Sequence, residues 1–138
     1  MKILLDKIDL ELKLKIMYIY TIIAVGGFGL WVLIAPDSLI TILSMPNQDK
    51  VTLGISGAVW LTFAILSILG LFNPHKYIPV LLFQMLYKLI WILAVFIPNV
   101  ITRGAEFYTI FTMIIFLTFI IGDILVIPFK DVFKLKPE

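Results

Sequence analysis

Four long apolar runs follow one another along the chain and are separated by short polar segments. These runs cover residues 16–36, 51–73, 77–98 and 106–128. Each is long enough for a membrane-spanning helix, which needs about 20 apolar residues. Lys88 interrupts the third run and Asp123 the fourth. The pattern predicts an all-α, polytopic membrane protein: a bundle of four transmembrane helices, here called spans one to four, in a single domain of residues 1–138.

Two further segments are expected to form short elements outside the spans. The first segment covers residues 1–15. Residues 8–16 alternate apolar and charged side chains, which is a strand pattern, but Leu, Glu and Lys favour helix. We predict an interfacial helix on the membrane surface, and the alternative is a solvated extension of span one. Residues 37–45 lie between two prolines and predict a short interfacial helix on the outer side, N-capped by Asp37, or a lid.

The basic residues beside the spans predict the orientation, because Lys and Arg are retained on the cytoplasmic side. One side holds Lys2, Lys7, Lys13, Lys15, Lys76, Lys130, Lys134 and Lys136. The other side holds Lys50 and Arg103. We therefore expect both termini in the cytoplasm.

Composition supports a lipid environment and excludes several kinds of chemistry. The chain of 138 residues is 62% hydrophobic and its mean hydropathy is +1.10, whereas apolar residues make up about 45–50% of soluble domains. With no Cys and a single His, we expect no disulfide, no metal site and no bound cofactor. Eleven basic residues against nine acidic ones form no basic stripe, so nucleic acid is not an expected partner. The expected partner is the lipid bilayer.

Small residues predict where spans one and two pack together. Span one has glycines at 26, 27 and 29, and span two has Gly54, Gly57 and Ala58, in which Gly54 and Ala58 form a small-xxx-small pair. Small residues let helix backbones approach closely in lipid, where no hydrophobic effect drives association. We expect these two helices to touch closely, and the alternative is room for a ligand beside the glycines of span one.

Lys88 is the most informative polar residue, because a charged lysine near the middle of a span costs roughly 2.5–3.5 kcal/mol and rarely faces lipid. Helical spacing puts it on one face with Leu81, Gln84 and Trp91, and that face is expected to look into the bundle. On a depth scale of about 1.5 Å per residue, Asp123 is the nearest carboxylate and Gln84 lies between the two in depth. The sequence therefore predicts a polar chain from Lys88 through Gln84 to Asp123.

Aromatic residues near the same depth suggest a pocket around Lys88. Membrane tryptophans usually lie at the interface, whereas Trp60 and Trp91 lie near the middle of their spans. With Tyr87 they are expected to wall a pocket for a flat or acyl ligand whose anionic or carbonyl group meets the ammonium; the alternative is a packed core. Hydroxyls expected in the same interior belong to Tyr20, Thr62, Ser67 and Thr118. The candidate ligand-binding residues are Lys88, Gln84, Trp91, Tyr87, Trp60 and Asp123.

Known catalytic motifs are poorly matched: the chain has no G-x-S-x-G elbow, P-loop or H-E-x-x-H. No catalytic residue is assigned, and a non-enzymatic role is favoured. The segments Gly-Leu-Trp-Val-Leu-Ile-Ala-Pro at 29–36 and Gly-Ile-Ser-Gly-Ala at 54–58 resemble the DoxX-like group of small four-span membrane proteins. The resemblance implies a multi-pass protein of a prokaryotic inner membrane, and some members of the group are associated with quinone-linked redox enzymes.

Three functions remain open. The first is binding of a quinone-, fatty-acid- or isoprenoid-like molecule in the pocket around Lys88. The second is a small proton- or ion-coupled transporter acting as a homo-oligomer, although span one lacks the acidic residue that similar exporters use. The third is an accessory subunit of a larger membrane complex, with the glycine faces as contact surfaces.

Overall fold

The computed structural model describes residues 1–134, and over that range the chain is helical with short connections and no strand. Four helices are long and apolar enough to cross a membrane: Lys2–Ile34, Lys50–Phe72, Ile78–Arg103 and Phe107–Val126. Large apolar side chains are exposed on these helices, for example Ile23 at 70% and Leu93 at 66%, as expected for faces that contact lipid. The predicted all-helical class and the four membrane-length helices are confirmed. Lys136, one of the lysines used for orientation, lies outside the described residues.

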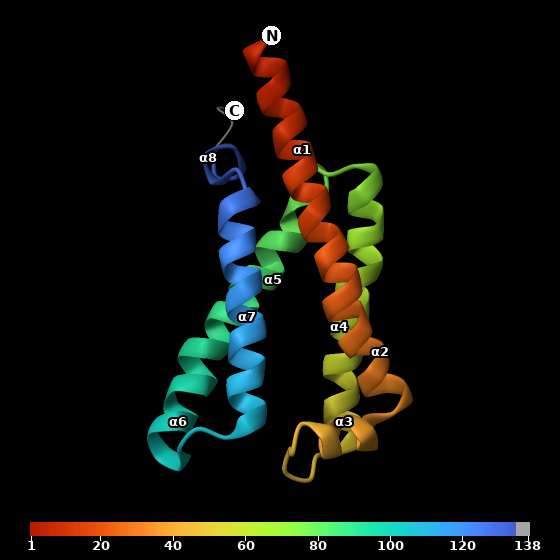
Figure 1. Ribbon diagram of the computed structural model, residues 1–138, viewed down its shortest axis with the longest axis vertical. Helices are drawn as coiled ribbons and strands as arrows, with labels where there is room; N and C mark the ends of the chain where they lie inside the picture. Colours follow the sequence, from red (N-terminus) through yellow and green to blue (C-terminus); the bar gives the residue numbers. More distant parts are fainter. Residues whose placement is uncertain (135–138) are drawn as a thin grey trace.

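Span one is a single continuous helix. It consists of α1 (Lys2–Tyr20), the π-helical turn η1 (Thr21–Val25) and α2 (Gly26–Ile34), 33 residues in all. At 1.5 Å per residue it is about 50 Å long, some 20 Å more than the hydrocarbon core of a bilayer. Its first turns project beyond the rest of the molecule (Figure 1). Residues 1–15 therefore extend span one, which was the alternative, and their position on a membrane surface stays a prediction.

The short helix after span one forms as expected, but the residue that caps its N-terminus differs from the prediction. Helix α3 (Pro36–Ile42) follows Ala35, with Pro36 in its first turn. Proline suits that position because its missing N–H would have no helical partner there and its φ is already helical. The expectation that Asp37 caps this helix is wrong, since Asp37 lies inside the first turn and its side chain accepts no capping hydrogen bond.

Helix α4 (Lys50–Phe72) has the side-chain cap that α3 lacks. Asp49 accepts hydrogen bonds from the Thr52 backbone N–H at 2.8 Å and from the Thr52 hydroxyl at 2.7 Å. These hydrogen bonds favour the ionised carboxylate and hold the pKa of Asp49 below its ordinary value. After α4 the tight turn over residues 73–76 reverses the chain, and its Lys76 N–H donates to Asn73 Oδ1 at 3.4 Å.

Span three runs past Pro98, where the sequence predicted its end. It comprises α5 (Ile78–Trp91), the π-helical turn η2 (Ile92–Phe96) and α6 (Ile97–Arg103). A π-turn directly before Pro98 accommodates the missing backbone donor, so the helix continues. Gly104 then ends it with φ +85°, a conformation that side chains rarely allow. The remaining helices are α7 (Phe107–Val126) and the short α8 (Phe129–Val132).

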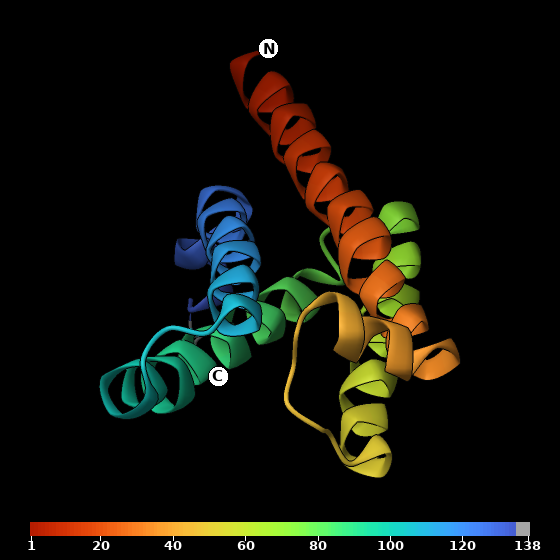
Figure 2. The ribbon, with the colours of Figure 1, turned by 60° about the horizontal axis from the view of Figure 1, so that its bottom comes forward.

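The helices form two pairs that diverge toward one end of the molecule. Helix α2 packs along α4, and α5 packs against α7. The pairs meet through α1 and α4, which contact α7 and α5, and they separate toward the end that carries α3 and α6 (Figures 1 and 2). The start of α1, the turn after α4 and α8 lie at the opposite end (Figure 1).

The expected close packing of spans one and two is confirmed, but through a different face of span two. A Cβ on Gly29 would lie 2.8 Å from the Leu61 backbone nitrogen and 2.9 Å from the Gly57 carbonyl oxygen. The Gly54–Ala58 pair is not in this contact, because a Cβ on Gly54 would meet nothing within 4 Å and Ala58 is exposed. The register of the helix places Gly57 and Leu61, and not Gly54, against α2.

Candidate functional site

A layer of buried polar residues crosses the interior where the two helix pairs meet. Thr21 in η1, Ser67 in α4, Gln84 in α5 and Asp123 in α7 are each 0% exposed. The Gln84 side-chain amide donates to Asp123 Oδ1 at 3.3 Å and to Thr21 Oγ1 at 3.2 Å. The Thr21 hydroxyl donates to the Met17 carbonyl at 2.8 Å. Side-chain hydrogen bonds thus join spans one, three and four.

Lys88 lies one helical turn from Gln84, and its ammonium is enclosed by aromatic rings. The residue is 1% exposed. Its Nζ lies 4.4 Å from the centroids of both the Tyr87 and Phe119 rings and 5.4 Å from that of Phe116. It has no hydrogen-bond acceptor, and no ion pair joins it to Asp123 within the described part of the chain. Ring faces attract a cation, but a buried ammonium without an acceptor is left incompletely satisfied.

Helical periodicity explains why these groups meet. In α5 the three least exposed side chains are Leu81, Gln84 and Lys88, which are spaced by three and four residues and so share one face. In α7 the same spacing puts Phe119 and Asp123 on one inward face. The predicted inward face of span three is confirmed for Leu81, Gln84 and Lys88.

An apolar cavity of about 80 Å³ lies beside Lys88, between the two helix pairs. Toward the buried polar layer it is lined by Lys88 and Tyr87, and Trp60 of α4 lines it as well. Toward α3 it is lined by Leu39, Leu43 and Met45. Nearly all of its lining is apolar, and Lys88 is its charged lining residue. An apolar pocket with one convergent charge is the usual form of a small-molecule site.

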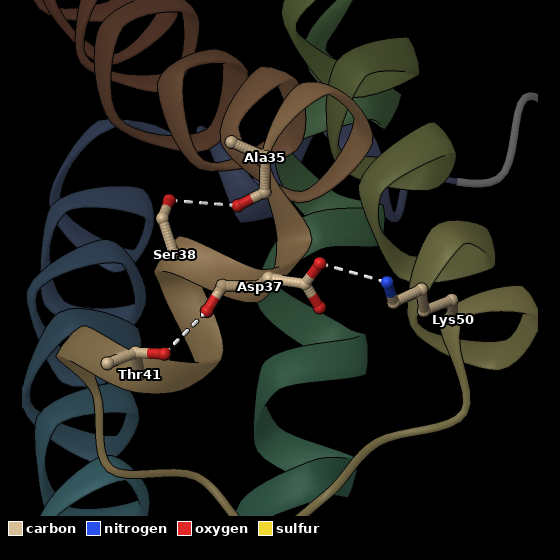
Figure 3. A network of polar contacts seen from close by, with 5 residues as sticks. All are labelled: Ala35, Asp37, Ser38, Thr41 and Lys50. Atoms are coloured by element: carbon tan, nitrogen blue, oxygen red, sulfur yellow. Dashed lines mark hydrogen bonds and ion pairs between the residues drawn. The ribbon is translucent and has the colours of Figure 1, made fainter.

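Helix α3 lies at one end of this cavity and is joined to the start of α4 by an ion pair. The Asp37 carboxylate pairs with Lys50 Nζ at 2.9 Å, which joins α3 to the start of α4 (Figure 3). Within α3 and its approach, Ser38 donates to the Ala35 carbonyl at 2.9 Å and Thr41 to the Asp37 carbonyl at 2.8 Å (Figure 3). The ion pair joins α3 to α4 on its exposed side, and the buried Leu39 of α3 lines the cavity.

The structure divides the six sequence-predicted site residues into two groups and leaves one apart. Lys88, Tyr87 and Trp60 line the cavity. Gln84 and Asp123 belong to the polar layer and do not line it. Trp91 also lies outside the cavity lining and packs edge-on against Phe116, with ring centroids 5.0 Å apart. Of the predicted polar chain, the link from Gln84 to Asp123 is present and the link from Lys88 to Gln84 is not.

The expected hydroxyls are only partly inside. Ser67 is buried, and the Tyr20 hydroxyl shares a hydrogen bond of 2.6 Å with Thr118 while its ring stacks on Phe119. Thr62 was expected in the polar interior and is exposed instead, where its hydroxyl donates to the Ala58 carbonyl of its own helix at 2.9 Å. Its helix turns that position toward the outside, and Thr118 is exposed as well.

Sequence reasoning missed three residues of this region. Thr21 is the hydrogen-bond partner of Gln84, and Phe116 and Phe119 supply two of the three rings around Lys88. A signal was present for the phenylalanines, because they precede Asp123 by seven and four residues and so share its face. Thr21 had no comparable signal, since it is one hydroxyl within a long apolar run.

Comparisons of the chain with protein-family models, with curated proteins and with solved structures find no match. The resemblance to DoxX-like proteins therefore rests on residues 29–36 and 54–58 alone. The function is argued below from the geometry of the site.

Proposed function

We propose that the chain is a multi-pass membrane protein with both termini in the cytoplasm, whose interior cavity binds a hydrophobic small molecule through Lys88. The candidate ligands are quinone-, fatty-acid- or isoprenoid-like molecules with an anionic or carbonyl group. The role is non-enzymatic. The binding residues in this proposal are Lys88, Tyr87 and Trp60. Gln84 and Asp123 do not contact the ligand and hydrogen-bond to each other in the adjoining polar layer.

One observation carries the proposal: a fully buried ammonium without an acceptor stands at one end of an apolar cavity. Intramembrane ionisable residues usually face the bundle interior and mark a functional site. Packing alone accounts poorly for Lys88, because a methionine would fill the same space without the cost of burying an ammonium. A ligand oxygen at Nζ supplies the missing acceptor.

The orientation is supported by the position of the chain ends. The start of α1, the turn over residues 73–76 and α8 lie at one end of the molecule (Figure 1). This end carries most of the lysines outside the spans, whereas the end with α3 and α6 carries Lys50 and Arg103. The positive-inside rule then places the first end in the cytoplasm.

Native mass spectrometry after gentle extraction tests the binding function directly. We expect a discrete non-lipid mass on the wild type that is lost in Lys88→Met and kept in Lys7→Met, which removes an exposed lysine of α1. Hydrogen bonds to charged groups contribute about 1.5–3 kcal/mol, so the loss should be at least about tenfold.

A second variant leaves the lysine in place and fills the cavity instead. Ala24 is a small residue of the lining, and Ala24→Leu should also displace the bound molecule. Retention of the same mass in both Lys88→Met and Ala24→Leu would refute the proposed site. An oligomer with ion-driven flux would instead favour a transporter, and a foreign subunit in place of a small molecule would favour an accessory role.

A further inference from the structure

We propose that the ligand of this cavity is a single-chain carboxylic acid, such as a long-chain fatty acid, bound with its carboxylate at Lys88 and its chain directed toward α3. This inference narrows the ligand class of the proposed function and rests on it. The orientation is unusual for a lipid, because the charged group lies deep in the membrane and the tail end lies near its outer surface.

The charge of the lining favours an acid over a neutral ligand. Lys88 is the charged residue of the lining, and its Nζ has three aromatic faces around it and no acceptor. A carboxylate both accepts hydrogen bonds and compensates the positive charge, and such charge-assisted hydrogen bonds are about twice as strong as neutral ones. A quinone carbonyl or an isoprenoid alcohol supplies a neutral acceptor, so its hydrogen bond to the ammonium is weaker than that of a carboxylate.

The shape of the cavity favours one unbranched chain over a ring. On α2 and the turn before it the lining extends from Ala24 to Val32, which is about 12 Å along a helix. The volume over this length is about 80 Å³, so a few methylene groups next to the carboxylate fill it and the rest of the chain continues between the diverging helix pairs. A polymethylene chain needs the least width of the three candidate ligands.

The two ends of the cavity determine which way the acid lies. The end at α3 offers the side chains of Leu39, Leu43 and Met45, none of which pairs with a carboxylate. Asp37 and Lys50 lie near that end, but they pair with each other and their side chains are 76% and 62% exposed. The carboxylate therefore has its partner at Lys88, and the apolar chain has its contacts under α3.

Two tryptophans allow the orientation to be measured. Trp60 lines the cavity near the middle of α4, seven residues before Ser67 of the polar layer. Trp31 packs against the cluster of Leu39 and Leu43, which Trp60 also borders, and it donates to Ser38 at 2.6 Å beside α3. Bromine quenches indole fluorescence at short range. Stearic acids brominated near the carboxyl group or near the methyl end would be titrated against two proteins that both keep Trp60 and carry Trp91→Phe. One of them keeps Trp31 and the other carries Trp31→Phe, so the difference between them reports on Trp31.

We expect the carboxyl-proximal bromine to quench Trp60 more than Trp31, and the distal bromine to do the reverse. Each measurement is compared with the same protein carrying Ala24→Leu, in which the cavity is filled. Subtracting its quenching removes the part that comes from acid dissolved in the micelle. The matched chemical control is the methyl ester of each acid, which keeps the chain and loses the charge. The ester and the Lys88→Met protein should each show at least about tenfold weaker binding.

The possible failures are distinguishable. Equal binding of acid and ester, or stronger quenching of Trp60 by the distal bromine, overturns this inference while a bound mass that depends on Lys88 still supports the proposed function. Absence of both quenching and a bound native mass overturns the two together. Quenching that is unchanged in Ala24→Leu shows that the acid lies outside the cavity and also overturns the inference.

Discussion

Adding one methyl group at Gly29 should destabilise the protein, whereas the same change two residues earlier should not. A Cβ on Gly29 would lie 2.8 Å from the Leu61 backbone nitrogen and 2.9 Å from the Gly57 carbonyl oxygen. Both are backbone atoms, so the clash is relieved only if α2 and α4 move apart. A Cβ on Gly27 would meet nothing within 4 Å. Gly27→Ala is thus a control for the same chemistry on the same helix.

The magnitude follows from the difference between the two variants. Gly→Ala raises helix propensity by roughly 1 kcal/mol in water, and whatever part of that gain survives in lipid applies to both positions. Overpacking a well-packed contact costs about 1–3 kcal/mol. We therefore expect Gly29→Ala to be about 1–3 kcal/mol less stable than Gly27→Ala, with Gly26→Ala also destabilised because its Cβ would meet the Ala64 Cβ at 2.8 Å.

Unfolding by sodium dodecyl sulfate in mixed micelles, followed by tryptophan fluorescence, gives the free energy of unfolding for each variant. The order expected is Gly27→Ala above wild type or equal to it, and Gly29→Ala clearly below both. If Gly29→Ala were as stable as Gly27→Ala, the close contact of α2 with α4 would be refuted. The outer wall of the proposed cavity would then be placed incorrectly as well, because α2 supplies part of it.

Two further predictions concern the connections between helices. Tyr18 is 0% exposed and its hydroxyl donates to the Pro74 carbonyl at 2.7 Å. Tyr18→Phe should therefore lower the free energy of unfolding in the same assay by about 1–3 kcal/mol. Tyr77→Phe, at a partly exposed position, is the control and should have little effect. For Asp49, whose pKa is held below its ordinary value in the folded state, the stabilisation is present above the unfolded pKa and is lost as pH falls through the lower folded pKa. Melting temperatures measured from about pH 7 to pH 3 should fall less in Asp49→Asn, which has an uncharged N-cap, than in the wild type. An equal fall of melting temperature with pH in both proteins would contradict the capping role.

The features that follow from periodicity and from the length of apolar runs could be predicted from the sequence. Membrane-length helices need only an uninterrupted run, and a buried face needs only polar residues spaced by three and four, as Gln84 and Lys88 are. The aromatic surroundings of Lys88 were partly predicted in the same way through Tyr87. These signals are local, so no knowledge of neighbouring helices is required.

The features that depend on contacts between helices could not be predicted. Which small residues of span two face α2 is decided by helix rotation, which placed Gly57 inside and Gly54 outside the contact. Pro98 and residues 1–15 have local patterns that are compatible with both an end and a continuation of a helix, and the structure shows continuation at both places. That Trp91 lies outside the cavity likewise depends on how α5 packs against Phe116.

Lys88 and Asp123 are the two charged residues that are buried in the described structure, although they form no ion pair. Their structural and ligand-binding roles can be separated by a double mutant. Lys88→Met leaves Asp123 as the remaining buried charge, and Asp123→Leu leaves Lys88, so each single change should cost somewhat less than the ~3–5 kcal/mol found when a contacting buried pair is broken. Replacing both residues removes both charges, and such double replacements are often neutral or stabilising.

We therefore expect the double variant Lys88→Met, Asp123→Leu to be more stable than either single variant in the detergent unfolding assay. It should nevertheless retain no bound molecule in native mass spectrometry, because the Lys88 ammonium that binds the ligand is gone. A double variant whose destabilisation equals the sum of the two single effects would show that the two charges do not interact. A stable double variant that still carries the ligand would show that Lys88 serves only the internal charge balance, and the binding site would have to be sought elsewhere.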